Sequence, residues 1–264
     1  FGLSAAARCA AGHRRDYHFF LSHLHWDHIM GFPFFGPAFD PQATITIHSG
    51  HADAESALRR QQEEISFPVP FEWLRAKFKF VTLGPGHTYE IGGLTVETIH
   101  QYHSHDSYGF RFDDGERIVI YSTDSEHRLD DMEQEARFEA FFANADMAIC
   151  DTMYSLADSV TMKEDWGHSS NLVAVDLCRV AGAKRLVLFH HEPSYSDEDI
   201  QRMHSETTRY EELMREEARS EGEQLLQRLA AQVNELVGAI PILYVREGKV
   251  ADELMTLLDE EPQI

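Results

Sequence analysis

Four side chains that can bind metal ions, His23, His25, Asp27 and His28, fall within six residues of one another. A single helix or strand cannot point so many side chains the same way, whereas a loop at a strand end can spread them. His23 and His25 could then serve one ion, while Asp27 and His28 serve a second ion about 3.5 to 4 Å away. The spacing therefore predicts a two-metal site.

Several polar residues follow short apolar runs that have the length of a strand. His23, His103, Asp124 and His190 come just after the runs at residues 17–21, 94–99, 118–121 and 186–189. Because strands with a common direction end at one edge of a sheet, we expect these side chains to converge. The remaining strand-sized runs lie at 44–48, 78–83, 147–150 and 242–245.

Helical patterns lie between these runs, at about residues 52–65, 128–143, 171–181 and 197–237. Such a mixture is typical of a layered α/β domain, and we expect a single domain over residues 1–264. Residues 204–223 are rich in glutamate and arginine and have little apolar periodicity. We interpret them as a solvated helical insertion rather than a partner-binding arm.

Composition narrows the expected partners and location. The formal net charge of −22 repels polyanions, so we expect a small-molecule substrate and no long nucleic acid partner. No apolar run approaches the ~20 residues of a membrane-spanning helix, and residues 1–12 lack the features of a signal peptide. We therefore expect a cytoplasmic protein without membrane contact. The widely spaced Cys9, Cys150 and Cys178 indicate buried free thiols.

The motif His-x-His-x-Asp-His, continued by Ile-Met-Gly-Phe-Pro-Phe-Phe, resembles the metallo-β-lactamase superfamily, and specifically its branch of ribonuclease Z and related phosphodiesterases. Further segments are similar to the same branch, at residues 103–111, 120–124, 151–154, 166–169, 189–193 and 246–248. The resemblance implies a four-layer αββα sandwich that lacks some N-terminal strands. It also implies a homodimer as one possible assembly.

The resemblance assigns the metal ligands to two groups that share one bridging residue. The first group is His23, His25 and His103, the second is Asp27, His28 and His190, and Asp124 bridges them. His105 and His191 compete with their neighbours His103 and His190, which the family register favours. Imidazole nitrogen and carboxylate oxygen suit Zn²⁺, and Mn²⁺ or Fe²⁺ as well.

Two residues are expected to act in catalysis, namely His168 and Asp27, the latter also a ligand. Gly167-His168-Ser169 resembles an element of the phosphodiesterase branch, so His168 would protonate the leaving alkoxide after metal-activated hydroxide attacks phosphorus. Small phosphodiesters such as cyclic nucleotides are the expected substrates. Three alternatives stay open: a lactone or thioester hydrolase, a metal-binding regulatory module without turnover, and a His168 that only caps a helix starting near Ser169.

Overall fold

The computed structural model describes residues 15–127, 131–155 and 167–237, with side chains described as far as residue 229. Residues up to His204 form one compact unit, and residues from Ser205 onwards form a second. The expectation of a single domain with a helical insertion at 204–223 stays a prediction. Cys9, Trp166, the expected strand at 242–245 and the similar segment at 246–248 lie outside the described residues.

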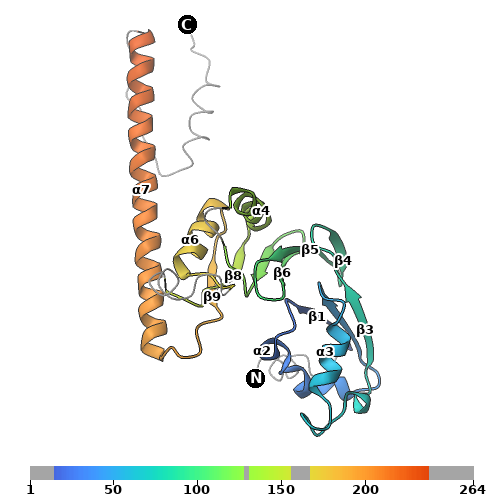
Figure 1. Ribbon diagram of the computed structural model, residues 1–264. Coiled ribbons are helices and arrows are strands. Elements are labelled where there is room, and N and C mark those ends of the chain that lie inside the picture. Colours follow the sequence, from blue (N-terminus) through green and yellow to red (C-terminus); the bar gives the residue numbers. More distant parts are fainter. Residues whose placement is uncertain (1–14, 128–130, 156–166, 238–264) are drawn as a thin grey trace. The chain divides into compact units, whose positions relative to one another are not determined.

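Within the described residues, the first sheet has three parallel strands in the order β1 (Asp16–Leu21), β2 (Thr44–Ser49) and β3 (Lys77–Thr82). Short helical turns follow β1, and a longer helix follows β2, as parallel connections require. These elements are α2 (Trp26–Ile29), η1 (Phe32–Phe34), η2 (Gly36–Phe39), α3 (Ala54–Gln61) and η3 (Phe71–Trp73). Figure 1 shows α3 lying along this sheet.

The second sheet has six strands in the part of the chain that the structure describes. Their order is β4 (Thr88–Ile91), β5 (Leu94–Gln101), β6 (Ser107–Asp113), β7 (Ile118–Ser122), β8 (Met147–Asp151) and β9 (Leu186–Phe189). Pairs from β4 to β7 are antiparallel, and β7, β8 and β9 are parallel. Strands β5, β7, β8 and β9 therefore run in one direction, and their carboxyl ends share an edge.

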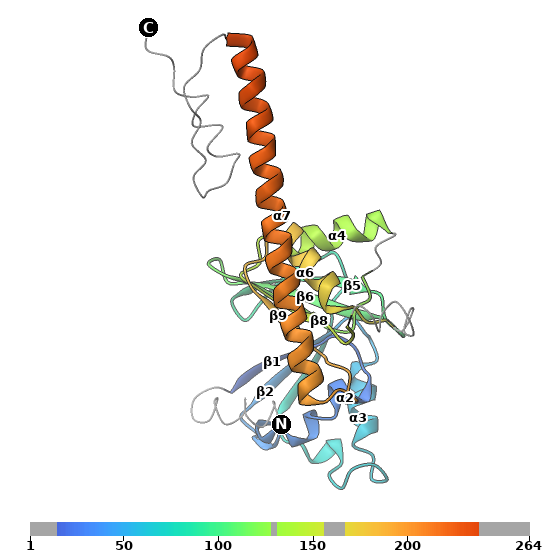
Figure 2. The same cartoon turned by 90° about the vertical axis from the view of Figure 1, so that its left-hand side faces the viewer.

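Among the residues described, three apolar cores lie between the layers. One joins the inner side of α3 and the short helical turns to the first sheet, with Ile45 and Ile47 at its centre. A second joins α4 (Met132–Phe142) and α6 (Asn171–Val180) to the second sheet around Phe142. The third, with Val96 and Phe110, lies between the two sheets. Figures 1 and 2 show the resulting order of helices, sheet, sheet and helices, so the four-layer expectation is confirmed.

Alternation along the strands assigns each side chain to its layer. In β1, Phe19 packs into the core under α3, whereas its neighbour Phe20 packs between the sheets. In β7, Ile120 faces the α4 and α6 side, and Tyr121 faces the first sheet. Side chains alternate between the two faces of any strand, and these runs are almost wholly apolar because both faces of the strands are covered.

Two strands were absent from the strand-sized runs, β4 and β6. Strand β4 has only four residues, and it joins β5 through Gly92 and Gly93, whose φ angles of +62° and +85° suit a two-residue hairpin turn. Helix α7 (Asp197–Val237) has the bounds expected from the sequence. Cys150 and Cys178 are buried free thiols, as expected. None of the described helices is both long and apolar enough to cross a membrane.

Candidate metal centre

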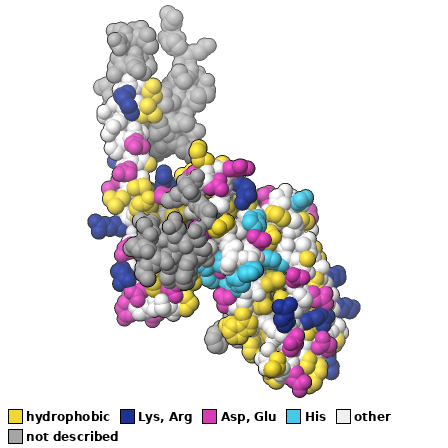
Figure 3. All heavy atoms as spheres, in the orientation of Figure 1, with side chains coloured by type: hydrophobic (Ala, Val, Ile, Leu, Met, Phe, Trp, Pro, Cys, Tyr) yellow, Lys and Arg dark blue, Asp and Glu magenta, His cyan; other side chains and the backbone are white. Residues whose placement is uncertain are grey.

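The candidate ligands lie where strands end. His23 and His25 follow β1, and the short helix α2, which begins at Trp26, carries Asp27 and His28 in its single turn. The other candidates come from the shared edge of the second sheet. There His103 follows β5, Asp124 follows β7 and His190 follows β9. Figure 3 shows histidine side chains gathered together on one face of the molecule.

Asp124 lies at the centre of this cluster. Asp124 Oδ2 is 3.4 Å from His28 Nε2. Asp124 Oδ1 is 3.5 Å from His190 Nε2, 3.6 Å from His23 Nε2 and 3.7 Å from His103 Nε2. Four imidazoles, two from the loop and two from the sheet edge, thus point at one buried carboxylate. A residue that bridges two ions needs this central position.

The clustered ligand atoms include the two expected groups, together with a group that crosses between them, His23, His28 and Asp124, and two groups that contain His168. His25 Nδ1 is 3.3 Å from His103 Nε2, and His23, His25 and His103 offer nitrogen atoms that all lie within 4.8 Å of one another. Asp27 Oδ2 is 3.2 Å from His28 Nε2. The ligand atoms of Asp27, His28 and His190 also lie within 4.8 Å of one another. The structure brings together all seven residues assigned from the sequence. Their role as ligands stays a prediction.

Two of these residues adopt a backbone conformation that is uncommon for residues other than glycine. The φ angles of Asp124 and His190 are +52° and +61°. Such conformations carry a cost of order 1–3 kcal/mol each and persist where the surrounding structure enforces them. Thr123 Oγ1 also donates a hydrogen bond of 2.6 Å to Asp124 Oδ2. His190 directly follows β9 and Asp124 lies two residues after β7, and both side chains point into the cluster.

The pKa values of Asp124 and of three candidate histidine ligands fit a metal site, whereas at His28 burial is outweighed by the Asp124 carboxylate, which raises the pKa. Burial lowers the pKa of His23 to about 2, and it also lowers the pKa of His25 and His103, so all three imidazoles are neutral at pH 7. Burial alone would raise the pKa of Asp124, but the surrounding histidines outweigh it and hold that pKa well below its usual range. Neutral imidazoles and an ionised carboxylate are the forms that bind divalent ions.

One buried atom gives a direct test of the fit. His23 Nε2 is buried and has no hydrogen-bond partner among the described residues. On the other side of the ring, Ser22 Oγ lies 3.2 Å from His23 Nδ1. An unpartnered buried nitrogen that faces a carboxylate and other imidazoles is costly unless an ion completes it. The residues present therefore fit a divalent metal cluster.

Gly167 holds His103 in place from behind. His103 Nδ1 donates a hydrogen bond of 2.9 Å to the Gly167 carbonyl oxygen, so that Nε2 is the nitrogen that faces the cluster. The φ of Gly167 is +82°, and a Cβ added there would lie 2.5 Å from His103 Nδ1. Gly167 N donates in turn to Glu126 Oε2 at 2.9 Å. The position thus requires glycine for both its conformation and its space.

His168 pairs with a buried carboxylate. His168 Nδ1 lies 2.7 Å from Asp151 Oδ2, and Asp151 also accepts hydrogen bonds from the backbone N–H groups of Ser125 and Met153. Burial lowers the pKa of His168, but the Asp151 carboxylate more than offsets this and raises it. A nitrogen of His168 lies within 4.8 Å of ligand atoms of His103 and Asp124. His168 does not cap helix α6. The N-cap of α6 is Ser170, whose side chain accepts a hydrogen bond from Val173 N.

Sequence reasoning left out some residues around the cluster and left two competitors open. Among the described residues, neither His105 nor His191 lies in a group of clustered ligand atoms, and His105 is exposed. Asp151 was not singled out as a functional residue. Its place at the end of an apolar run could have indicated a functional role, because the neighbouring strands β7 and β9 also end close to candidate ligands.

Residues 13–191 match a family model described as the β-lactamase superfamily domain, which is more than half of the chain. The chain belongs to the metallo-β-lactamase superfamily, in its ribonuclease Z-like branch. It is 22% identical to ribonuclease Z of Oceanobacillus iheyensis, over 69% of this chain and 72% of that protein. It is 24% identical to ribonuclease Z of Bradyrhizobium diazoefficiens, over 73% of this chain and 78% of that protein.

A solved structure has the same fold. The metallo-β-lactamase fold protein YhfI of Bacillus subtilis superimposes with a TM-score of 0.54 and 21% identity, over 70% of this chain and 68% of that one. As a superfamily member, the chain is a metal-binding hydrolase.

The relatives correct one expectation from composition. We expected a small-molecule substrate and no long nucleic acid partner, but the curated relatives are ribonucleases, so that expectation is wrong. Net charge is a sum over the whole chain, and α7 contributes many acidic residues to it. Divalent ions reverse the field locally, so the sum does not describe the field at the centre.

Proposed function

We propose that this protein is a two-metal phosphodiesterase that hydrolyses RNA. The observation that carries the proposal is the Asp151–His168 pair beside the cluster around Asp124, because it adds a proton donor to a metal site. The relatives named ribonuclease Z support RNA as the polymer. Cyclic nucleotides contain the same phosphodiester and serve as comparison substrates. A cytoplasmic location stays part of the proposal.

The metal ions would be held as the two groups of side chains suggest. His23, His25 and His103 would bind one ion, Asp27, His28 and His190 the other, and Asp124 both. Zn²⁺ suits this donor set, and Mn²⁺ or Fe²⁺ suits it as well. Bound there, two divalent ions would supply an activated water near neutral pH and neutralise charge on the phosphoryl oxygens.

The chain's own residues provide the proton transfer. His168 donates a proton to the alkoxide that leaves phosphorus, and its raised pKa keeps it protonated closer to neutral pH. Asp151 fixes the ring through Nδ1, so that Nε2 is the nitrogen directed away from the carboxylate and toward the reaction. Asp27, whose side chain is 63% exposed, orients water at the open side of the centre.

The competing functions differ in their need for this donor. A thioester hydrolase expels a thiolate, a weaker base than an alkoxide, and would keep its activity without His168. A lactone hydrolase expels an alkoxide and would keep its activity without His168 where attack at the carbonyl carbon limits the rate. A regulatory module would bind metal and turn nothing over. The Asp151–His168 pair has no part in either, so its geometry favours the phosphodiesterase.

The test measures cleavage of an RNA oligonucleotide, a cyclic nucleotide, a lactone and a thioester by protein loaded with Zn²⁺ or Mn²⁺. We expect RNA cleavage by the unaltered protein and a loss of at least about 10²-fold in His168→Ala at unchanged metal content. His105→Ala is the matched control, because His105 is exposed and outside the cluster. Full metal loading without phosphodiester cleavage would exclude the proposal, and so would lactone or thioester turnover that survives His168→Ala.

A further inference from the structure

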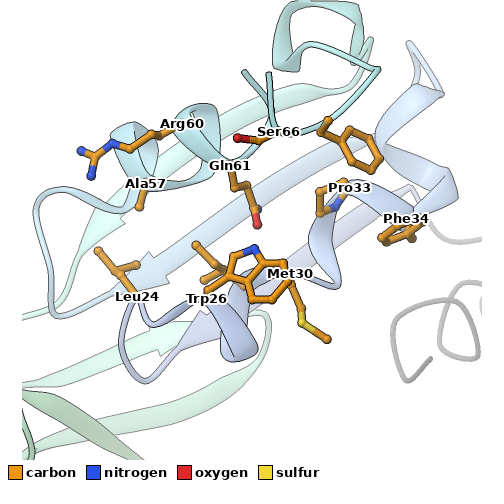
Figure 4. Close-up of a pocket in the computed structure, with 11 residues that line it drawn as sticks. Leu24, Trp26, Met30, Pro33, Phe34, Ala57, Arg60, Gln61 and Ser66 are labelled. Atoms are coloured by element: carbon orange, nitrogen blue, oxygen red, sulfur yellow. The ribbon is translucent and has the colours of Figure 1, made fainter. Parts of the chain in front are cut away.

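A pocket of about 660 Å³ lies on the first sheet's side of the metal loop. Its floor includes Leu24 and Trp26, the residues that alternate with the ligands His23, His25 and Asp27. Helix α3 forms the opposite wall (Figure 4). The volume is within the range of about 300–1,000 Å³ typical of small-ligand pockets. The pocket and the metal cluster therefore share the loop after β1, with alternate side chains of that loop turned toward each.

The pocket presents aromatic surface to solvent. Trp26 is 71% exposed and Phe34 is 62% exposed, although both belong to the lining. Phe34 packs edge-on against Phe67, with 5.5 Å between ring centroids, which fixes that wall. Large apolar rings left in solvent as a contiguous group indicate a binding surface rather than a core. A flat ligand could stack on the Trp26 ring.

The polar side chains of the lining are Arg60, Gln61 and Ser66. Gln61 Nε2 is buried and has no hydrogen-bond partner among the described residues. Figure 4 shows the Gln61 side chain reaching from α3 toward the Trp26 ring. Arg60, the preceding residue, extends from the same helix and supplies positive charge at the edge of the pocket. An aromatic ring, an amide and a guanidinium can respectively stack on a base, bond its edge and contact a phosphate.

We propose that this pocket binds one base of the RNA next to the scissile phosphodiester, stacked on Trp26 and hydrogen-bonded by the Gln61 amide. The inference rests on the proposed function and specifies its substrate contact. Trp26 follows directly after the ligand His25, so adjacent residues of one loop would contact a base in the pocket and hold the metal centre. Stacking on an aromatic side chain is tolerant of sequence, which suits a general RNA contact.

The experiment measures binding without turnover. Calorimetric titration of the metal-loaded full chain uses adenosine 5′-monophosphate and ribose 5-phosphate, which share a phosphate and differ in the base. We expect the nucleotide to bind about ten-fold more tightly or better. Trp26→Ala should remove that ratio and leave the affinity for ribose 5-phosphate unchanged. Gln61→Leu should reduce the ratio, since the base loses its hydrogen bond.

Trp73→Ala is the matched control, because Trp73 is also exposed, at 64%, and does not line the pocket. Equal affinity for the two probes in the unaltered protein would overturn the inference without any variant. An equal change in Trp26→Ala and Trp73→Ala would also overturn it. RNA cleavage without base discrimination would reject the pocket alone, whereas base discrimination without RNA cleavage would reject the proposed function alone.

Discussion

The loop after β1 holds four candidate ligands within six residues, whereas the second sheet contributes its candidates singly from the ends of β5, β7 and β9. In the loop, neighbours along the chain are neighbours in space. At the sheet edge, His103 and Asp124 meet only because β5 and β7 run the same way. The loop is thus a local structure, and the edge depends on the order and register of the sheet.

We expect the largest loss of metal and activity from replacing Asp124 at the sheet edge, and a smaller loss from replacing Asp27 in the loop. Asp124→Ala removes the carboxylate that four imidazoles surround, so we expect loss of both metal ions and a fall in phosphodiester cleavage beyond about 10⁴-fold. Asp27→Ala alters an exposed carboxylate of the loop and should cost less in metal content. Elemental analysis of the dialysed proteins and initial rates would check this, and equal metal loss in both variants would contradict it.

A second prediction separates proton transfer from metal binding at the sheet edge. His168→Ala should lower cleavage by about 10²- to 10⁴-fold, because a positioned general acid contributes that much. Asp151→Asn should act in the same direction through the His168 ring that it orients. Metal content should match that of the unaltered protein in both variants. A loss of one ion along with activity would show instead that His168 is a ligand.

The third prediction concerns a histidine of the first sheet outside the centre. His48 is 3% exposed. Burial, and to a smaller extent electrostatic repulsion from the nearby His18, lowers the pKa of His48 from 6.5 to about 4. The unfolded chain therefore binds a proton between pH 6.5 and 4 that the folded chain does not. Stability conferred by neutral His48 is complete above pH 6.5 and is lost as the pH falls.

Between pH 8 and pH 5 we expect this histidine to account for a loss of about 2 kcal/mol in the free energy of unfolding. Urea unfolding of the metal-free protein at several pH values would measure it, with His48→Gln for comparison. The glutamine variant should show a correspondingly flatter pH dependence. Parallel curves for the two proteins would contradict the prediction.

The smallest effect should come from the glycine that supports His103. Gly167→Ala places a Cβ against the His103 ring and should weaken metal binding about ten-fold, the size expected for a lost supporting contact. Gly115→Ala is the control, because Gly115 also has a positive φ, of +86°, but open space around it. Competition with a metal chelator would measure both affinities. Equal weakening in the two variants would show that conformation alone matters.

The same contrast explains what could be predicted from the sequence. The loop from His23 to His28 could be predicted because its ligands are adjacent, and the strands could be located from their apolar runs. The order of the strands could not, so the edge ligands depended on the family resemblance. The four residues of β4 have no apolar run of their own, and pairing with β5 through the glycine turn makes them a strand.

Contacts across the sheet were the least accessible to sequence reasoning. Gly167 supports His103 across 64 residues of chain, and His168 meets Asp151 only because the segment before α6 returns to the end of β8. The error about nucleic acid has a similar cause. Net charge carries no information about where charges lie, whereas the field at a site depends on its immediate neighbours.

The most direct test of the two-metal phosphodiesterase is a titration of metal-free protein with Zn²⁺, with bound metal and RNA cleavage measured at each step. The site around Asp124 predicts that two ions bind per chain and that cleavage rises with the second ion. Full cleavage with a single bound ion, or none with two ions bound, would contradict it.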